Sequence, residues 1–355
     1  MRNPIAAILL AVGFGSIPAC SADEPKPAPA KQTLAIGDKA PPLKVTKWVQ
    51  GEEVKDFAAG KVYVVEFWAT WCGPCISAMP HLVELQEEFK KDLVVIGMTS
   101  KDERGNNKES VEKFVDKNKA KFTYRFAYSD DRDTDNAYME AAKQDGIPCS
   151  FVVDRAGKIA YIGHPMELDL VLPKVVDGTW KGQVDVDAIA MANTELEKIM
   201  EAAEQKPEEA LPKLAEFEKK YAIKAKQDMF QIQKMILMMK AKKYDDAKVV
   251  GEALLTKSVA KKKAIPGAYT GMILVDKKLN PDKKHLDLAT KSLETVLEFD
   301  PKDVSLLLAS LELQLALGDR AKAAEFGKKA VAATDEKEKK DVEKLVDKLL
   351  KGSEK

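Results

Sequence analysis

Two cysteines, Cys72 and Cys75, follow closely on a run of apolar and β-branched residues at 62–68. Such a run is typical of a strand that is buried on both faces of a sheet. A helical pattern begins at Pro74, where the missing N–H of proline costs little. The first thiol is therefore expected at a helix N-terminus, where unpaired N–H groups and the helix dipole stabilise a thiolate. Because thiolates attack disulfides, this arrangement predicts a redox-active dithiol.

Strand and helix patterns alternate around this motif, from Gly37 to about Trp180. Further strand patterns occur at 93–98, 124–128, 150–153 and 159–162, the last two forming a hairpin. Helical patterns occur at 74–89, 107–118, 135–144 and 167–176. This order predicts an α/β domain with a mixed sheet and helices on both faces.

The sequence changes in character after residues 181–182. Alanine, lysine, leucine and glutamate dominate, apolar residues recur with a helical period, and no strand pattern is found. Ala247, Ala289 and Ala323 stand at similar places near the start of a second helix, with an apparent insertion at 256–267. This region resembles tetratricopeptide repeats, whose small alanines let paired helices approach closely. A generic helical bundle is the alternative.

The first twenty residues have the pattern of an export signal. Arg2 precedes an apolar run at 5–17, which is too short for a permanent membrane span but suits a signal-peptide core. Ala19 before Cys20 resembles the lipobox of bacterial lipoproteins, which implies that Cys20 is lipidated. The alternative is a soluble exported protein cut near Ala19 or Ala22. Either route leads to a compartment where disulfides form.

The chain is expected to contain four segments. These are a signal peptide with a lipobox at 1–20, a proline-rich tether at 21–34, a redox domain at 35–182 and a helical domain at 183–355. Membrane attachment is expected through the lipid alone, since no later segment is apolar enough to cross a bilayer. Lys plus Arg and Asp plus Glu each number 57, and this zero net charge argues against nucleic-acid binding.

The sequence EFWATWCGPC at 66–75 resembles the active site of the thioredoxin fold. The signal peptide, the residues at 37–42 and a long insert after the second strand resemble the exported, TlpA-like branch of the redoxins. The likeness covers about residues 35–180 and includes Pro80 and Gly146-Ile147-Pro148. It implies a thiol–disulfide oxidoreductase that acts mainly as a protein-disulfide reductase. Its partners would be disulfide-bonded client proteins and an external thiol donor, and it would need no cofactor.

This resemblance also implies roles for individual residues. Cys72 matches the nucleophile, Cys75 the resolving thiol and Pro148 the cis-proline that faces them. Ile147 would offer its backbone groups to an incoming peptide in strand-like pairing. The other positions expected to shape the substrate groove are Trp71, Gly73 and Pro74.

Glu66 is a carboxylate within an apolar strand, six residues before Cys72. Burial would raise its pKa and make it a usable proton carrier. Thioredoxins carry a buried acid at the matching place, which implies that Glu66 helps to deprotonate Cys75. The alternative is a glutamate that pairs with a lysine or opens to water.

Some positions depart from the family pattern. Cys149 follows the cis-proline position, where threonine or another small residue is usual; we expect a buried core residue, with a third redox thiol as the alternative. Ala78 stands where TlpA-like reductases often carry an acid. His81 is expected to be solvent-exposed rather than catalytic. No metal site is expected, because structural zinc sites need a second closely spaced ligand pair.

The favoured prediction is an exported thiol–disulfide oxidoreductase whose helical domain docks a client or partner protein. Two other functions stay open. In the first, the protein is a binding module: the helical domain carries the main function and the redox domain is accessory to it. A thiol peroxidase shares the fold, but it needs one peroxidatic cysteine with nearby threonine and arginine. The direction of electron flow depends on the folded environment of the dithiol.

Overall fold

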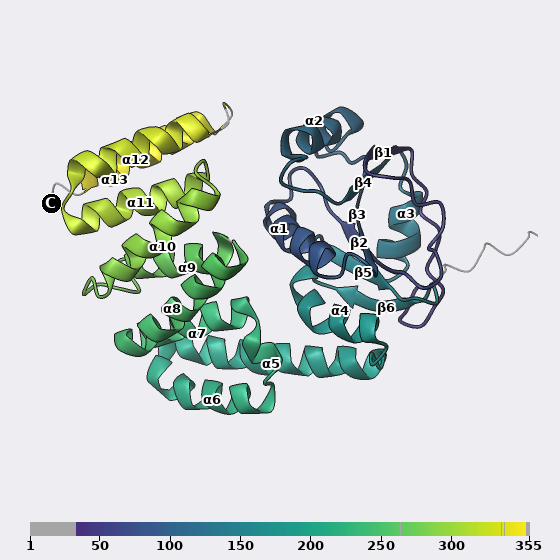
Figure 1. The fold of residues 1–355 in the computed structure, drawn as a ribbon, viewed down its shortest axis with the longest axis horizontal. Helices are drawn as coiled ribbons and strands as arrows, with labels where there is room; N and C mark the ends of the chain where they lie inside the picture. Colours follow the sequence, from purple (N-terminus) through teal and green to yellow (C-terminus); the bar gives the residue numbers. More distant parts are fainter. Residues whose placement is uncertain (1–32, 263, 335, 337, 353–355) are drawn as a thin grey trace, which may run out of the picture.

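The computed structural model describes residues 33–352, apart from 263, 335 and 337. An α/β domain is followed by helices that curve away from it and then rise beside it (Figure 1). The expected signal peptide, Cys20 and most of the tether lie outside the described residues. Leu34, which we assigned to the tether, is buried, and its N–H donates to Ala141 O at 2.9 Å. The packed domain therefore begins slightly earlier than expected.

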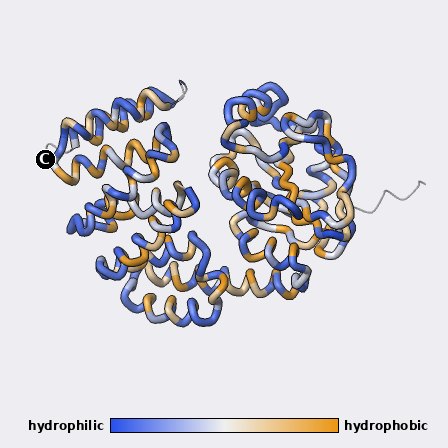
Figure 2. The backbone as a smooth tube through the Cα atoms, in the orientation of Figure 1, coloured by the Kyte–Doolittle hydropathy of each residue, from blue (hydrophilic) through white to orange (hydrophobic). Residues whose placement is uncertain are grey.

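The α/β domain is built on a six-stranded mixed sheet in the order β1-β4-β3-β2-β5-β6. Its strands are β1 (Lys47–Gln50), β2 (Val62–Phe67), β3 (Leu93–Ser100), β4 (Arg125–Ser129), β5 (Cys149–Val153) and β6 (Ile159–Gly163). The pairs β2–β3 and β3–β4 are parallel, and the other pairs are antiparallel. Apolar residues concentrate on these central strands (Figure 2). Every residue of β2 is buried, including Glu66.

Helices cover both faces of this sheet, as the sequence predicts. The elements are α1 (Gly73–Glu88), α2 (Lys108–Asn118), the short α3 (Asp133–Asp135) and α4 (Leu168–Asp177). The core beneath α1, α2 and α4 is separate from the core on the opposite face, where Tyr138 packs.

Two details of the sheet domain differ from expectation. The sequence pattern does not reveal β1, because this strand is short and only partly buried at the edge of the sheet. The helix predicted at 135–144 is instead α3 followed by a π-helical turn at Asn136–Glu140. The wider turn brings the consecutive residues Tyr138 and Met139 both into the buried layer.

The described part of the C-terminal region contains helices and no strand. They are α5 (Gln183–Gln205), α6 (Pro207–Lys220), α7 (Asp228–Lys240), α8 (Tyr244–Lys261), α9 (Ala264–Val275), α10 (Leu286–Phe299), α11 (Val304–Leu317), α12 (Arg320–Ala333) and α13 (Lys339–Gly352). Sequential helices pack in pairs, α5 with α6, α7 with α8, α9 with α10, and α11 with α12.

The second helix of each pair carries a buried alanine at its fourth residue. These alanines are Ala210, Ala247, Ala289 and Ala323. A residue without a long side chain allows two helix backbones to approach closely. The expected insertion at 256–267 is only partly right, because the helical residues of that stretch belong to the end of α8 and the start of α9. The extra residues lie in a longer α8 and in the connection 276–285.

The helical region packs directly against the α/β domain. Ile189 of α5 contacts the core that lies beneath α1 and α4. Lys224, just before α7, donates to both carboxylate oxygens of Glu167 at 3.0 Å. A second ion pair joins the two regions after α10, where Lys121 Nζ lies 2.8 Å from Asp300 Oδ2. The two regions are thus joined by both apolar and charged contacts.

Candidate active site

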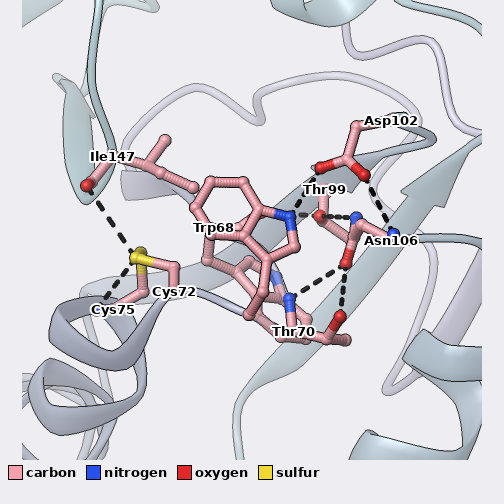
Figure 3. Close-up of a disulfide and its surroundings, with 9 residues drawn as sticks. Trp68, Thr70, Cys72, Cys75, Thr99, Asp102, Asn106 and Ile147 are labelled. Atoms are coloured by element: carbon pink, nitrogen blue, oxygen red, sulfur yellow. Dashed lines mark hydrogen bonds between the residues drawn. A yellow bond between two sulfur atoms is a disulfide. The ribbon is translucent and has the colours of Figure 1, made fainter. Parts of the chain in front are cut away.

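Cys72 and Cys75 are joined by a disulfide at the N-terminus of α1 (Figure 3). The chain leaves the buried strand β2 at Phe67 and enters α1 at Gly73, so the two cysteines lie just beyond the C-terminal end of this central strand. Cys72 is the N-cap of α1, and its Sγ accepts a hydrogen bond from the Cys75 N–H at 3.2 Å. The geometry is the one that stabilises a thiolate on Cys72.

The loop before β5 faces this disulfide, although it is distant in the sequence. The Ile147–Pro148 peptide bond is cis. Ile147 O lies 3.8 Å from Cys72 Sγ, and a dashed line joins these two atoms in Figure 3. The structure thus brings the expected Cys72, Ile147 and Pro148 together, where β2 ends and β5 begins.

Glu66 points into the buried layer beneath α1. Val64 and Trp68 lie on the same face of this stretch and belong to the apolar cluster that contains Cys75. Burial raises the pKa of Glu66 to about 8, although a hydrogen bond from Ser150 Oγ to Glu66 Oε2 opposes this rise. Glu66 Oε1 has no hydrogen-bond partner in the described structure. These contacts disfavour the alternatives of a lysine partner or an opening to water.

Trp71 forms an exposed lip beside the disulfide. Its indole Nε1 donates to Asp102 Oδ2 at 2.7 Å, and the guanidinium carbon of Arg104 lies 3.6 Å from its ring centroid. Asp102 and Arg104 come from the insert between β3 and α2. Neither residue was predicted to belong to the site, and the length of this insert was the only signal for them in the sequence.

A buried asparagine ties that insert to the redox motif. Asn106 Oδ1 accepts from the Thr70 N–H at 2.9 Å and from Thr70 Oγ1 at 3.0 Å. Its Nδ2 donates to Thr99 Oγ1 at 2.8 Å and to Ser100 O at 2.7 Å. Figure 3 shows Asn106 between the end of β3 and the loop that precedes the disulfide. The position of Trp71 therefore depends on the insert.

The expectation for Cys149 agrees with the structure, whereas the expectation for His81 does not. Cys149 is buried, and burial raises its thiol pKa to about 12, which supports a core role over that of a third redox thiol. The expectation that His81 is exposed is wrong, because this side chain is buried. It lies 3.8 Å from Glu84 on α1 and 3.7 Å from Asp169 on α4. The α1 sequence alone does not reveal that α4 and the helical region cover this face.

Within the described residues, no three His, Cys, Asp or Glu side chains gather in an arrangement that would hold a metal ion. No helix in that part of the chain combines the length and apolar character needed to span a membrane.

A mixed sheet with Cys-x-x-Cys at a helix start and a facing cis-proline defines a thioredoxin-fold redox protein. Residues 36–162 match the model of the AhpC/TSA family. Protein FixW of Rhizobium leguminosarum is 34% identical over 153 residues, covering 42% of this chain and 69% of that protein. Thiol-disulfide oxidoreductase ResA of Geobacillus kaustophilus is 31% identical over 132 residues, covering 37% and 71% respectively. The chain belongs to the AhpC/TSA family, and it is a thiol–disulfide oxidoreductase.

Solved structures also match part of this chain. A thiol-disulfide isomerase from Corynebacterium glutamicum has 25% identity and a TM-score of 0.33, covering 39% of this chain and 96% of that one. The thioredoxin domain of a thiol-disulfide oxidoreductase from Bacteroides vulgatus has 25% identity and a TM-score of 0.31, covering 37% and 89%.

Proposed function

We propose that this protein reduces disulfides in exported client proteins through the Cys72/Cys75 dithiol. One observation carries the proposal: the pair lies at the start of α1 and faces the loop that contains the cis-proline. A client chain that pairs with the backbone of Ile147 would present its disulfide to Cys72. Trp71, Gly73 and Pro74 would border the groove that holds this chain.

Thiol–disulfide exchange with the client takes place in two steps. The Cys72 thiolate attacks one client sulfur, and the other client sulfur leaves as a thiolate that takes up a proton. The Cys75 thiolate then attacks Cys72 Sγ, which forms the enzyme disulfide and releases the second client thiol. Two electrons and two protons have passed to the client. An external thiol donor must then reduce the enzyme disulfide.

Glu66 is proposed to accept the proton of Cys75 before the second step. Cys75 is almost fully buried, so bulk water has little access to its thiol. Glu66 faces the same buried layer, and with a pKa of about 8 the ionised form that can accept a proton becomes more abundant as the pH rises towards 8. A carboxylate at this place would speed release of the client without contacting it.

Export and partner binding are also part of the proposal. The signal-like segment 1–20 would direct the chain to the cell envelope or periplasm, with Cys20 as the lipid-bearing residue. The helical region would be a tetratricopeptide-like domain that docks a client or another partner. Its sequential helix pairs, each with a buried alanine in the second helix, support that assignment.

A trapping experiment tests the redox role. In Cys75→Ser the second step cannot occur, so a client should stay attached to Cys72 through a mixed disulfide. Non-reducing electrophoresis and mass spectrometry would identify that adduct. Cys72→Ser is the matched control and should give no client adduct.

Assays of the reduced wild-type protein distinguish disulfide reduction from the alternative peroxidase function. Failure of the reduced wild-type protein to reduce any protein disulfide would contradict the proposal. Faster oxidation by hydrogen peroxide than by protein disulfides would favour the thiol peroxidase. Equilibration with a series of glutathione redox buffers would give the direction of electron flow.

A further inference from the structure

The insert between β3 and α2 places a planar cation beside the disulfide. The guanidinium carbon of Arg104 lies 3.6 Å from the centroid of the Trp71 ring. Trp71 immediately precedes Cys72, and 39% of its surface is exposed. One lip of the candidate active site is therefore an indole ring with an arginine stacked on it.

Hydrogen bonds hold this lip in place. Asp102 accepts from Trp71 Nε1 through Oδ2, and its Oδ1 accepts from the backbone N–H groups of Arg104 at 2.8 Å and Asn106 at 2.9 Å. Asn106 in turn binds Thr70 (Figure 3). Arg104 is thus carried on a loop that is fastened to the redox motif itself.

The charge of Arg104 is available to a ligand. Within residues 33–352 that the structure describes, its guanidinium contacts the indole and has no ion-pair partner. Lys101 and Glu103 in the same loop are exposed and opposite in charge, so they offset each other. The oxygens of Asp102 already accept three N–H groups. Guanidinium donors therefore remain free at the edge of the site.

The opposite lip is formed by the cis-proline loop. Trp71 and Ile147 both line a cavity of about 180 Å³, and Asp145 contributes an exposed carboxylate to its wall. A client chain that lies along Ile147 would pass between these two lips. Arg132 and Asp135 also line this cavity, but they pair with each other, with Arg132 Nη2 3.7 Å from Asp135 Oδ1. The charges left for the side chain next to the reactive cysteine are Asp145 and Arg104, which reaches the site through its contact with Trp71.

We propose that Arg104 selects client disulfides that carry an aspartate or glutamate next to the attacked cysteine. A carboxylate can form two parallel hydrogen bonds with a guanidinium group, and stacking on Trp71 holds that group in a fixed plane. This selection rests on the proposed reduction of client disulfides. Arg104 takes no part in the bond changes, which remain the transfer of two electrons and two protons described above.

Three substrates test this selection. Two are peptide disulfides that are identical except for aspartate or lysine beside the cysteine, and the third is the uncharged bis(2-hydroxyethyl) disulfide. Pre-reduced protein, freed of reductant, is mixed with each in a single turnover. Each peptide rate is divided by the rate with the uncharged substrate, which removes any general damage to the site.

The wild-type protein should favour the aspartate peptide by about three- to tenfold at low salt, and less at high salt. Arg104→Ala should bring the ratio near one, and Arg104→Glu should reverse it. Lys101→Ala is the matched control, because this cation lies in the same loop without stacking on Trp71, and it should keep the preference.

Equal normalised rates in the wild type, or an unchanged ratio in Arg104→Ala, would overturn the inference. A lysine preference that Asp145→Asn removes would also overturn it and would place recognition on the opposite lip. Failure with all three disulfides would overturn the proposed function and this inference with it.

Discussion

The buried carboxyl group of Glu66 makes the stability of the folded protein depend on pH. In the unfolded chain its carboxyl group titrates near 4.5, whereas burial raises its pKa to about 8 in the folded protein. Between these two values the folded protein keeps a proton that the unfolded chain has released. A rise in pH through this window therefore lowers the free energy of unfolding.

Glu66→Gln should remove this pH dependence, because glutamine has no proton to lose. The wild-type protein should lose stability on the order of a few kcal/mol between pH 5 and pH 8, and the variant should lose much less. Urea unfolding of the oxidised protein at a series of pH values measures the difference. Parallel stability curves for the two proteins would contradict this prediction.

Ser150→Ala is a matched variant for the same carboxyl group. Loss of the Ser150 hydrogen bond removes an interaction that lowers the pKa of Glu66, so the pKa should rise further. The pH dependence of client reduction should shift in the same direction if Glu66 accepts the proton of Cys75. An unchanged pH–rate profile in both variants would remove Glu66 from the proposed mechanism.

The sequence could predict the burial of Glu66 but not its environment. An acid within an apolar strand is visible in the chain itself. Ser150 is 84 positions away, and only the antiparallel pairing of β2 with β5 brings it opposite Glu66. Arg104 was missed for a similar reason, because nothing local shows that it will stack on Trp71.

At the scale of elements, Asn106 connects the end of β3 to the loop that precedes α1. Asn106→Ala should destabilise the protein by about 2–4 kcal/mol, because it leaves several buried polar groups without partners. Chemical denaturation measures this loss. The exposed neighbour Asn107 caps α2, and Asn107→Ala should cost about 0.5–2 kcal/mol.

Loss of Asn106 should also disturb the environment of Trp71. The fluorescence of the folded protein should therefore change in Asn106→Ala but not in Asn107→Ala. Equal stabilities and equal native spectra for the two variants would show that Asn106 does not hold the lip of the site.

The elements that could be predicted are those with a strong local pattern. Buried strands such as β2 and β3 are continuous apolar runs, and α1 is marked by the cysteine motif and Pro74. The edge strand β1 and the π-helical turn at Asn136–Glu140 depend on contacts with distant parts of the chain. The helix pairs could be expected from alanine spacing, whereas the division of the extra residues between α8 and the connection at 276–285 could not.

At the scale of the whole molecule, a partly hidden ion pair joins the two regions. The side chains of Lys224 and Glu167 are 9% and 16% exposed, and Asn193 also donates to Glu167 at 3.0 Å. By contrast, the Lys121 side chain of the Lys121–Asp300 pair is 53% exposed. This difference could not be predicted from the sequence, because Lys224 stands among other lysines in a polar stretch.

Lys224→Ala should weaken the connection far more than Lys121→Ala. Removal of Lys224 leaves the Glu167 carboxylate enclosed without its counter-ion, which should cost about 2–4 kcal/mol, whereas the exposed pair should contribute less than about 1 kcal/mol. All four tryptophans lie at or before Trp180, so fluorescence reports on the α/β domain and circular dichroism mainly on the helices.

These two probes should give coincident urea transitions in the wild-type protein and separated transitions in Lys224→Ala. The double variant Glu167→Gln/Lys224→Met should recover part of the loss, because no uncompensated charge is then enclosed. Equal losses in Lys224→Ala and Lys121→Ala would show that burial of the pair does not matter. Coincident transitions in Lys224→Ala would show instead that the apolar contacts of Ile189 and its neighbours suffice to couple the two regions.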